Sequence, residues 1–224
     1  MEYQIIIPAR ANSKRLPGKN MKLLSGKPLI QYSIEFALSM FEKSNIWVNS
    51  DDLNIIRLAK IKGIKTLTRP SNISADFTPT IDVLKHHVNH LINEKVVFDA
   101  IILLQPTNPF RDKIFVQNSI RVFENSGRES LATFSKSKKK LGKIRNNNFK
   151  PINYFPGQRS QDLDSSYYEN GLLYIIKTNS ILKGEIITRD VYPLICNNIE
   201  SSVDIDTLED FVFAESILKI KNHL

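Results

Sequence analysis

Four basic side chains lie close together in the segment that follows the first apolar run of the sequence. The run is Ile5-Ile6-Ile7-Pro8, and the cations behind it are Arg10, Lys14, Arg15 and Lys19. Before the last cation, Pro17-Gly18 favours a bend in the backbone. Guanidinium, ammonium and free backbone N–H groups can together bind a triphosphate and offset its charge. The pattern predicts a polyphosphate-binding loop, with a basic surface loop as the alternative.

The chain as a whole is also basic. Its 224 residues include 31 Lys and Arg against 23 Asp and Glu, which gives a net charge of +8. Such an excess indicates an anionic partner: a nucleic acid, a membrane surface or a phosphorylated metabolite. A second basic run, Lys136–Arg145, lies in polar sequence and is interpreted as a solvated surface.

Several other kinds of chemistry are excluded. The sequence contains no G-x-G-x-x-G, no G-x-x-x-x-G-K-[ST] and no G-x-S-x-G motif. His86, His87 and His90 lie together in a helical segment. Because His86 and His90 fall opposite its apolar face and no HExxH glutamate accompanies them, a solvated helix face is predicted rather than a metal site. The single cysteine, Cys196, has no nucleophile motif around it and is predicted to be structural.

Short apolar runs alternate with segments of helical spacing along most of the chain. Strands are predicted at Tyr3–Pro8, Ile46–Asn49, Ile64–Thr68, Ala100–Leu104, Ser130–Phe134 and Tyr167–Lys177. Helices are predicted from Pro28 to Met40, from an Asp51 cap to Gly63, and at Pro79–Glu94, Lys113–Asn125 and Thr207–Ile220. This alternation is typical of an α/β fold with a parallel sheet covered on both faces, a Rossmann-like three-layer sandwich. Ligands of such folds bind beyond the carboxyl ends of the strands, where the basic loop begins.

One segment breaks the alternation. Residues 136–166 are rich in Lys, Asn and Ser, which suits an excursion from the sheet. We therefore expect one α/β domain made of residues 1–135 and 167–224, with 136–166 inserted. With one cysteine and no apolar stretch of the ~20 residues that a membrane span needs, a cytoplasmic protein without a membrane partner is expected.

Five segments of the sequence resemble the CMP-sialic acid synthetases, the acylneuraminate cytidylyltransferases. The first, I-P-A-R-x-x-S-K-x-x-P-x-K-N, contains the basic loop. The others are Leu103–Arg111 (L-L-Q-P-T-N-P-F-R), Ser160–Leu163 (S-Q-D-L), Glu169–Ile175 (E-N-G-L-L-Y-I) and Ser202–Thr207 (S-V-D-I-D-T). They occur in the family's order and cover nearly the whole chain.

The resemblance implies a nucleotidyltransferase fold of the nucleotide-diphospho-sugar transferase type, with a mostly parallel mixed sheet. It implies that the hydroxyl of a sialic-acid-like nonulosonic acid attacks CTP, giving CMP-sugar and pyrophosphate. By motif position, the resemblance assigns CTP binding to Arg10, Ser13, Lys19, Asn20, Arg69 and Thr80. Of these, Arg10 and Lys19 would be catalytic, stabilising the charge of the leaving pyrophosphate. It assigns sugar binding to Gln105, Arg159 and Asn170, and implies a homodimer joined through residues 136–166.

Asp204 and Asp206 hold the positions of the family's catalytic Mg²⁺ ligands. Carboxylates at i and i+2 of an extended chain point to the same side and can share one ion, and Mg²⁺ prefers such oxygen ligands. Asp206 and Glu209 also form a D-x-x-E pattern that can cap the last helix, and the two roles can coexist.

One motif that the resemblance connects with sugar binding differs from the family's pattern. The family's R-Q-D-L-P has its arginine one place earlier here, as Arg159, so that residue reaches the sugar only from a loop or from a partner subunit. If the segment is a regular strand, Gln161 or Ser160 replaces it. Legionaminic, pseudaminic and Kdo cytidylyltransferases are alternatives. From another class, a basic nucleic-acid-binding α/β protein would use Lys136–Arg145, but no stacking platform accompanies that run, and no nucleic acid partner is expected.

Overall fold

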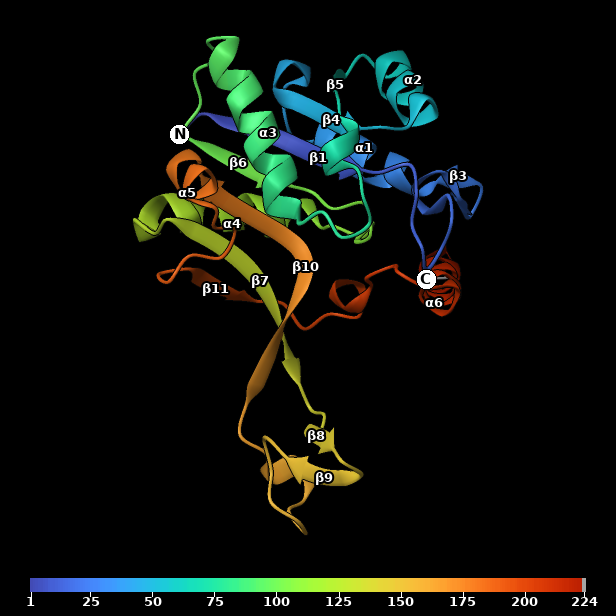
Figure 1. Cartoon of the computed structure of the whole chain (residues 1–224), viewed down its shortest axis with the longest axis vertical. Coiled ribbons are helices and arrows are strands. Elements are labelled where there is room, and N and C mark those ends of the chain that lie inside the picture. The colour runs from blue at the N-terminus through green and yellow to red at the C-terminus, as the bar shows by residue number, and fades with distance from the viewer. Residues whose placement is uncertain (223–224) are drawn as a thin grey trace.

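A seven-stranded sheet forms the centre of the computed structural model, which describes residues 1–222 (Figure 1). Its strands are β1 (Tyr3–Ala9), β4 (Ile46–Ser50), β5 (Lys65–Thr68), β6 (Ala100–Leu103), β7 (Ser130–Ser137), β10 (Ser166–Lys177) and β11 (Tyr192–Ile195). Their order is β11-β7-β10-β6-β1-β4-β5. Neighbours run parallel except at β10, which is antiparallel to both β6 and β7. The predicted mostly parallel mixed sheet is confirmed.

Helices cover both faces of the sheet because alternate strand residues are apolar on both sides. The helices are α1 (Leu29–Leu38), α2 (Leu53–Ile61), α3 (Thr80–Asn93), α4 (Lys113–Ser126), α5 (Thr178–Lys183) and α6 (Leu208–Asn222). In β1, Ile5 and Ile7 join a core with α1, α2 and α4. Ile6, one position between them, joins a second core with α3 and α5. The predicted three-layer sandwich is therefore confirmed.

A third apolar cluster joins the two ends of the chain. Val203 and Ile205 pack with Phe211 of α6 against Leu16 and Leu24, of which Leu24 lies in a small hairpin formed by β2 (Leu23–Leu24) and β3 (Lys27–Pro28). The cluster places the segment before α6 beside the basic loop, although nearly two hundred residues separate them in the sequence.

Two helix caps differ from those predicted. The cap of α2 is Asp52, whose carboxylate accepts from the backbone N–H groups of Asn54 and Ile55, whereas Asp51 accepts from the N–H of Ala11 in the basic loop. At α6, the D-x-x-E prediction is wrong. Thr207 and Asp210 form the reciprocal pair, because Asp210 Oδ2 accepts from the Thr207 N–H and Thr207 Oγ1 from the Asp210 N–H.

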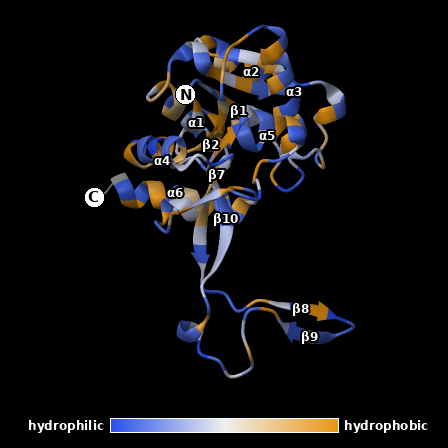
Figure 2. Cartoon of the chain, turned by 90° about the vertical axis from the view of Figure 1, so that its left-hand side faces the viewer, coloured by the Kyte–Doolittle hydropathy of each residue, from blue (hydrophilic) through white to orange (hydrophobic). Residues whose placement is uncertain are grey.

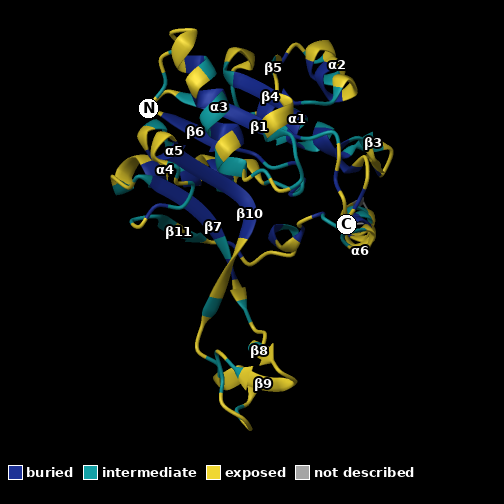
Figure 3. Cartoon of the chain, in the orientation of Figure 1, coloured by how far each residue is buried: buried dark blue, intermediate teal, exposed yellow. Residues whose placement is uncertain are grey.

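An arm projects from the sheet where the strand–helix alternation stops. β7 and β10 remain paired up to Ser137 and Ser166, beyond the body of the sheet (Figure 1). The arm ends in a hairpin of β8 (Gly142–Arg145) and β9 (Asn148–Pro151), followed by a single 3-10 turn, Ser160–Asp162. Most of the residues in this end of the arm are exposed (Figure 3).

The three histidines of α3 do not lie on a solvated face. His87 is completely buried and His86 and His90 are half-buried, because Trp47 of β4 packs against the rings of His87 and His90. Within residues 1–222, no three His, Cys, Asp or Glu side chains are grouped as a metal site. Cys196 is buried, as expected for a structural cysteine. The described helices include none that is long and apolar enough to cross a bilayer.

Candidate active site

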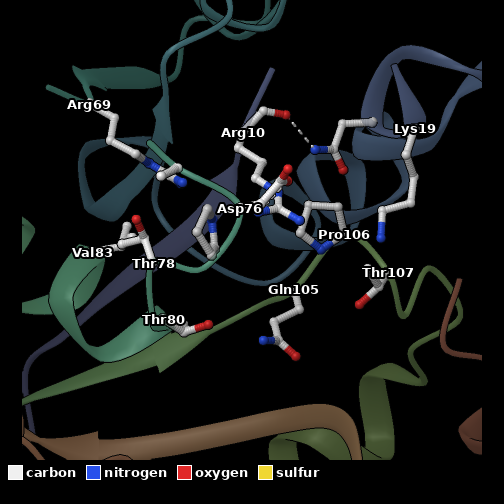
Figure 4. A pocket seen from close by; sticks show the side chains of 13 residues that line it. Arg10, Lys19, Arg69, Asp76, Thr78, Thr80, Val83, Gln105, Pro106 and Thr107 are labelled. Carbon is white, nitrogen blue, oxygen red and sulfur yellow. Dashed lines mark hydrogen bonds and ion pairs between the residues drawn. The ribbon is translucent and has the colours of Figure 1, made fainter. Parts of the chain in front are cut away.

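A pocket of about 270 Å³ opens beyond the carboxyl ends of β1 and β6 (Figure 4). The residues that line it come from the end of β1, the basic loop, the segment between β5 and the first turn of α3, and the loop after β6. They are Pro8, Arg10, Lys19, Asn20, Arg69, Ala75, Asp76, Thr78, Thr80, Val83, Gln105, Pro106 and Thr107. The pocket thus brings together six of the residues assigned to CTP or sugar by motif position. It contains three cationic side chains and a single carboxylate, so it favours an anion.

The end of the basic loop is fixed by a lysine that is only 8% exposed. Lys19 Nζ donates to the carbonyl of Ile205 at 2.7 Å and to Asp206 Oδ1 at 2.8 Å. Asn20 Nδ2 donates to the carbonyl of Arg10 at 3.0 Å, which closes the loop on itself (Figure 4). Lys19 is therefore part of the folded core of the site as well as a lining residue.

Arg10 faces a carboxylate that the sequence patterns did not indicate. Its Nη1 lies 2.9 Å from Asp76 Oδ1, and Lys14 Nζ lies 3.9 Å from Asp76 Oδ2. Asp76 belongs to the loop between β5 and α3, and only the fold brings it across the pocket to the basic loop (Figure 4). An anion that binds Arg10 must compete with this carboxylate.

Arg69 enters the pocket from the side opposite Lys19 (Figure 4). It is 7% exposed, and its Nε donates to Asn49 Oδ1 at 2.9 Å. Burial lowers the pKa of its guanidinium and the charge of Arg10 lowers it further, while the Asp51 carboxylate acts in the opposite direction. The group presents a buried, oriented set of donors to the pocket.

Asp204 and Asp206 lie beside this pocket without lining it. Val203 and Ile205 are buried, so the alternation of an extended backbone turns Asp204 and Asp206 the other way, as the sequence predicts. Asp206 also pairs with Arg15 at 2.6 Å. Burial raises the pKa of Asp204, the Thr107 hydroxyl opposes that shift, and the negative charge of Asp206 raises it further. Two neighbouring carboxylates with this mutual repulsion fit a divalent cation.

A second hollow of about 470 Å³ adjoins the first and shares Thr80 and Gln105 with it. Its apolar walls come from Pro79, Ile81, Leu103, Ile186 and Ile187, and its polar side from Glu169 and Tyr174. The Tyr174 hydroxyl donates to Glu169 Oε2 at 3.2 Å. Because burial raises the pKa of Tyr174, its hydroxyl stays protonated and remains a donor.

Asn170, which the resemblance assigns to sugar binding, is buried close to this site. Its side chain is buried and bonds to Thr133 Oγ1, at 2.6 Å, and Ser135 Oγ, at 3.0 Å. It lines neither hollow and instead shapes a register shift in β10. The next residue, Gly171, has φ +73°, and a Cβ there would meet Asn108 Oδ1 at 2.8 Å, so this close approach requires glycine.

Two further residues assigned by motif position lie away from the pocket walls. Ser13 is buried within the basic loop and does not line the pocket. Arg159 lies in the arm, where its side chain is 70% exposed and pairs with Asp162 at 2.7 Å. Its segment is a turn and not a strand. Two of the predicted routes therefore remain open for Arg159: it reaches the sugar from a loop, or it reaches the sugar of a partner subunit.

Comparison with known proteins identifies relatives along the entire chain. Residues 4–223 match the family described as cytidylyltransferase. CMP-N,N'-diacetyllegionaminic acid synthase of Legionella pneumophila is 31% identical over 98% of this chain and 97% of its own length. Pseudaminic acid cytidylyltransferase of Campylobacter jejuni is 31% identical over 100% and 98%. N-acylneuraminate cytidylyltransferase of Streptococcus agalactiae is 30% identical over 92% of this chain but only 51% of its own length, so this chain spans about half of that relative.

Solved structures share the fold at low sequence identity. CMP:2-keto-3-deoxy-manno-octonic acid synthetase complexed with CTP superposes with a TM-score of 0.69 at 18% identity, over 99% of this chain and 100% of the other. 4-Diphosphocytidyl-2C-methyl-D-erythritol synthase of Anaerococcus prevotii gives 0.68 at 15%, over 97% and 96%. From the match over residues 4–223 and the full-length relatives, the chain belongs to the cytidylyltransferases, a family of nucleotidyltransferase enzymes.

Proposed function

We propose that this enzyme transfers the cytidylyl group of CTP to the anomeric hydroxyl of a nonulosonic acid of the sialic acid type. The observation that carries the proposal is the pair of adjoining hollows. One is lined by the cations Arg10, Lys19 and Arg69, the other has apolar walls, and Gln105 lies between them. In the reaction a bond forms between the sugar oxygen and the α-phosphorus. The bond from that phosphorus to pyrophosphate breaks, and the hydroxyl proton is released.

Arg10 and Lys19 bind the triphosphate in this proposal. Lys19 is already held in place by Ile205 and Asp206, so little reorganisation is needed when phosphate arrives. Arg10 exchanges the Asp76 carboxylate for a phosphate oxygen. Both cations offset the negative charge that grows on the leaving pyrophosphate, which is where such sites provide most of their catalysis.

Asp204 and Asp206 are proposed to hold Mg²⁺. They supply two carboxylate ligands beside the pocket, and substrate phosphates complete the coordination that Mg²⁺ prefers. The bound ion would neutralise phosphate charge and polarise the phosphorus for attack. Asp206 Oδ1 also lies 2.8 Å from Lys19 Nζ, so the same carboxylate holds a phosphate-binding cation in place.

The second hollow is proposed to bind the sugar acid. Ile81, Ile186 and Ile187 offer apolar surface to an acyl methyl group, and Gln105 and Glu169 offer polar contacts to hydroxyl and amide groups. Among residues 1–222, those that line the hollow include no Arg or Lys, yet every nonulosonic acid carries a carboxylate. A cation from elsewhere must therefore meet that carboxylate.

A homodimer is proposed as the source of that cation. The arm carries large exposed apolar side chains, among them Ile144 at 73%, Phe149 and Phe155, and its hairpin includes hydrophobic positions (Figure 2). Exposed apolar surface of this kind suits a second copy of the chain. Arg159 lies on the same arm, so dimerisation would carry its guanidinium towards the partner's sugar hollow.

The proposed activity is tested by incubating the protein with CTP, Mg²⁺ and a panel of α-keto acid sugars while pyrophosphate release is followed. N-Acetylneuraminic, legionaminic and pseudaminic acids and Kdo form the panel, with sugar-free and Arg10→Ala reactions as controls. Release that depends on one nonulosonic acid supports the proposal. Release with Kdo alone, or with none of the four, would contradict it.

The proposed dimer is tested by light scattering at micromolar concentration. Ile144→Glu places a charge on the exposed hairpin, where it leaves the sheet untouched, and should convert a dimer into a monomer. Ile61→Glu, at a side chain of α2 that is equally exposed, is the matched control and should remain dimeric. A wild-type monomer would refute this part of the proposal.

A further inference from the structure

Three buried polar side chains form a chain of contacts from the nucleotide pocket into the layer between the sheet and α3. Arg69 lines the pocket, its Nε donates to Asn49 Oδ1 at 2.9 Å, and its Nη2 donates to the Asn49 carbonyl at 3.1 Å. The amide nitrogen of Asn49 lies 3.3 Å from His87 Nδ1. Asn49 and His87 are both fully buried, so water does not compete for these contacts.

Arg69 and the His87 ring hold the Asn49 amide from its two ends. Because Asn49 Oδ1 accepts from Arg69, its Nδ2 must face His87, and His87 Nδ1 must accept the bond. The proton of the neutral ring then sits on Nε2, a buried atom without a hydrogen-bond partner in the described chain. Burial lowers the pKa of His87 to about 3, so the ring stays neutral near pH 7. The ring itself is held edge-on against Trp47, at 5.2 Å between centroids.

Only one end of the guanidinium is used by the protein. Nε and one N–H of Nη2 bond to Asn49, whereas Nη1 forms no hydrogen bond with residues 1–222. The guanidinium is planar, so fixing two of its nitrogens also fixes the direction of the third. Its remaining N–H groups are thereby held as donors at the wall of the pocket.

We propose that Asn49 and His87 are positioning residues which hold Arg69 as a rigid donor that selects cytosine over uracil. This inference rests on the proposed function: with the triphosphate on Arg10 and Lys19, the base lies on the opposite side of the pocket, where Arg69 enters (Figure 4). Cytosine presents two neighbouring acceptors, O2 and N3, whereas N3 of uracil carries a hydrogen. A fixed pair of donors matches cytosine and leaves a donor facing a donor with uracil, which is the more costly mismatch when the site is buried.

The test measures kcat and KM separately for CTP and for UTP. Asn49→Ala removes the acceptor of Arg69 Nε, and His87→Phe keeps a ring against Trp47 but cannot accept from Asn49. Each should raise KM for CTP roughly five- to tenfold, the size of one lost hydrogen bond of ordinary strength, and reduce the preference for CTP over UTP. The kcat for CTP should stay within about twofold, because neither side chain touches the reacting phosphate.

A conservative variant and a matched control separate positioning from packing. In His87→Asn, the side-chain oxygen takes the place of Nδ1 as an acceptor, so CTP selectivity should return towards the wild-type value. Gln4→Ala removes a buried amide on the same face of the sheet, one that accepts from Trp47 Nε1 at 2.9 Å and lies at the far end of β1. It should lower stability and leave the ratio of CTP to UTP unchanged.

Double variants distinguish this inference from the proposed function. In an Arg69→Ala background, Asn49→Ala should have no further effect on KM for CTP, because Asn49 acts through Arg69. If Asn49→Ala raised KM for CTP equally in the wild-type and Arg69→Ala backgrounds, the positioning role alone would be overturned. The same holds if His87→Asn behaved like His87→Phe. An Arg69→Ala variant with unchanged KM for CTP would overturn the base contact as well.

A measurement on the wild-type protein does not depend on how the variants fold. The nitrogen chemical shifts of His87, observed by NMR, should report a neutral ring protonated on Nε2 at pH 7. A ring protonated on Nδ1 could not accept from Asn49 and would overturn the inference.

Discussion

The buried ring of His87 makes the stability of the protein depend on pH in a range where most proteins change little. Unfolded histidine has a pKa near 6.5, whereas burial lowers the pKa of folded His87 to about 3. Between these values the unfolded chain binds a proton that the folded chain excludes. The contribution of neutral His87 to the free energy of unfolding is therefore fully present above pH 6.5 and is lost as the pH falls towards 3.

The loss of stability at a given pH follows from how many pH units that pH lies below the pKa of unfolded histidine. At pH 5 the solution is about one and a half pH units below it, and each unit corresponds to about 1.4 kcal/mol. His87 should thus lower the free energy of unfolding by about 2 kcal/mol between pH 7 and pH 5. For a domain with a total stability of about 5–15 kcal/mol, this loss is readily measured.

Urea unfolding at pH 7 and pH 5, for wild type and His87→Asn, checks the prediction. The variant cannot be protonated, so it should lose about 2 kcal/mol less than the wild type over this interval. His86→Asn, on the same helix at a half-buried position whose pKa burial also lowers, should have a smaller effect. Identical pH dependence in wild type and His87→Asn would refute the assignment of a neutral buried ring.

Three further predictions concern the site. Arg10→Ala and Lys19→Ala should each lower kcat/KM for CTP by about 100- to 1000-fold, the effect of losing one donor to developing charge. Only Lys19→Ala should also lower Tm clearly, because Lys19 is buried and Arg10 is partly exposed; equal kcat/KM to wild type in both would contradict the phosphate assignment. Asp206→Ala should remove Mg²⁺-dependent turnover, whereas Asp210→Ala should cost about 1 kcal/mol of stability through its cap and keep the Mg²⁺ requirement, as urea and Mg²⁺ titrations would show. Asp76→Asn should lower KM for CTP severalfold by freeing Arg10, and an increased KM would show that Asp76 contributes to binding instead.

The sequence by itself determined the layers of the fold and the position of the basic loop at the carboxyl end of the first strand. Apolar runs such as Ile5-Ile6-Ile7 have no polar face, so they belong inside a sheet covered on both sides, and the structure buries them in two cores. The paired aspartates were also readable, because Val203 and Ile205 alternate with Asp204 and Asp206 on extended backbone. These features depend on local spacing and on the chemistry of neighbouring residues.

The tertiary structure alone decided which polar residues meet. Asp76 opposes Arg10, and His87 lies against Asn49, through contacts between segments that share no local pattern. Helical periodicity predicted His86 and His90 opposite the apolar face, but it cannot show that Trp47 of a neighbouring strand packs against the rings of His87 and His90. The family resemblance assigns Asn170 to the sugar, yet its side chain is buried at the register shift of β10 and bonds to Thr133 and Ser135. Such placements depend on packing between distant segments, which spacing along the chain does not encode.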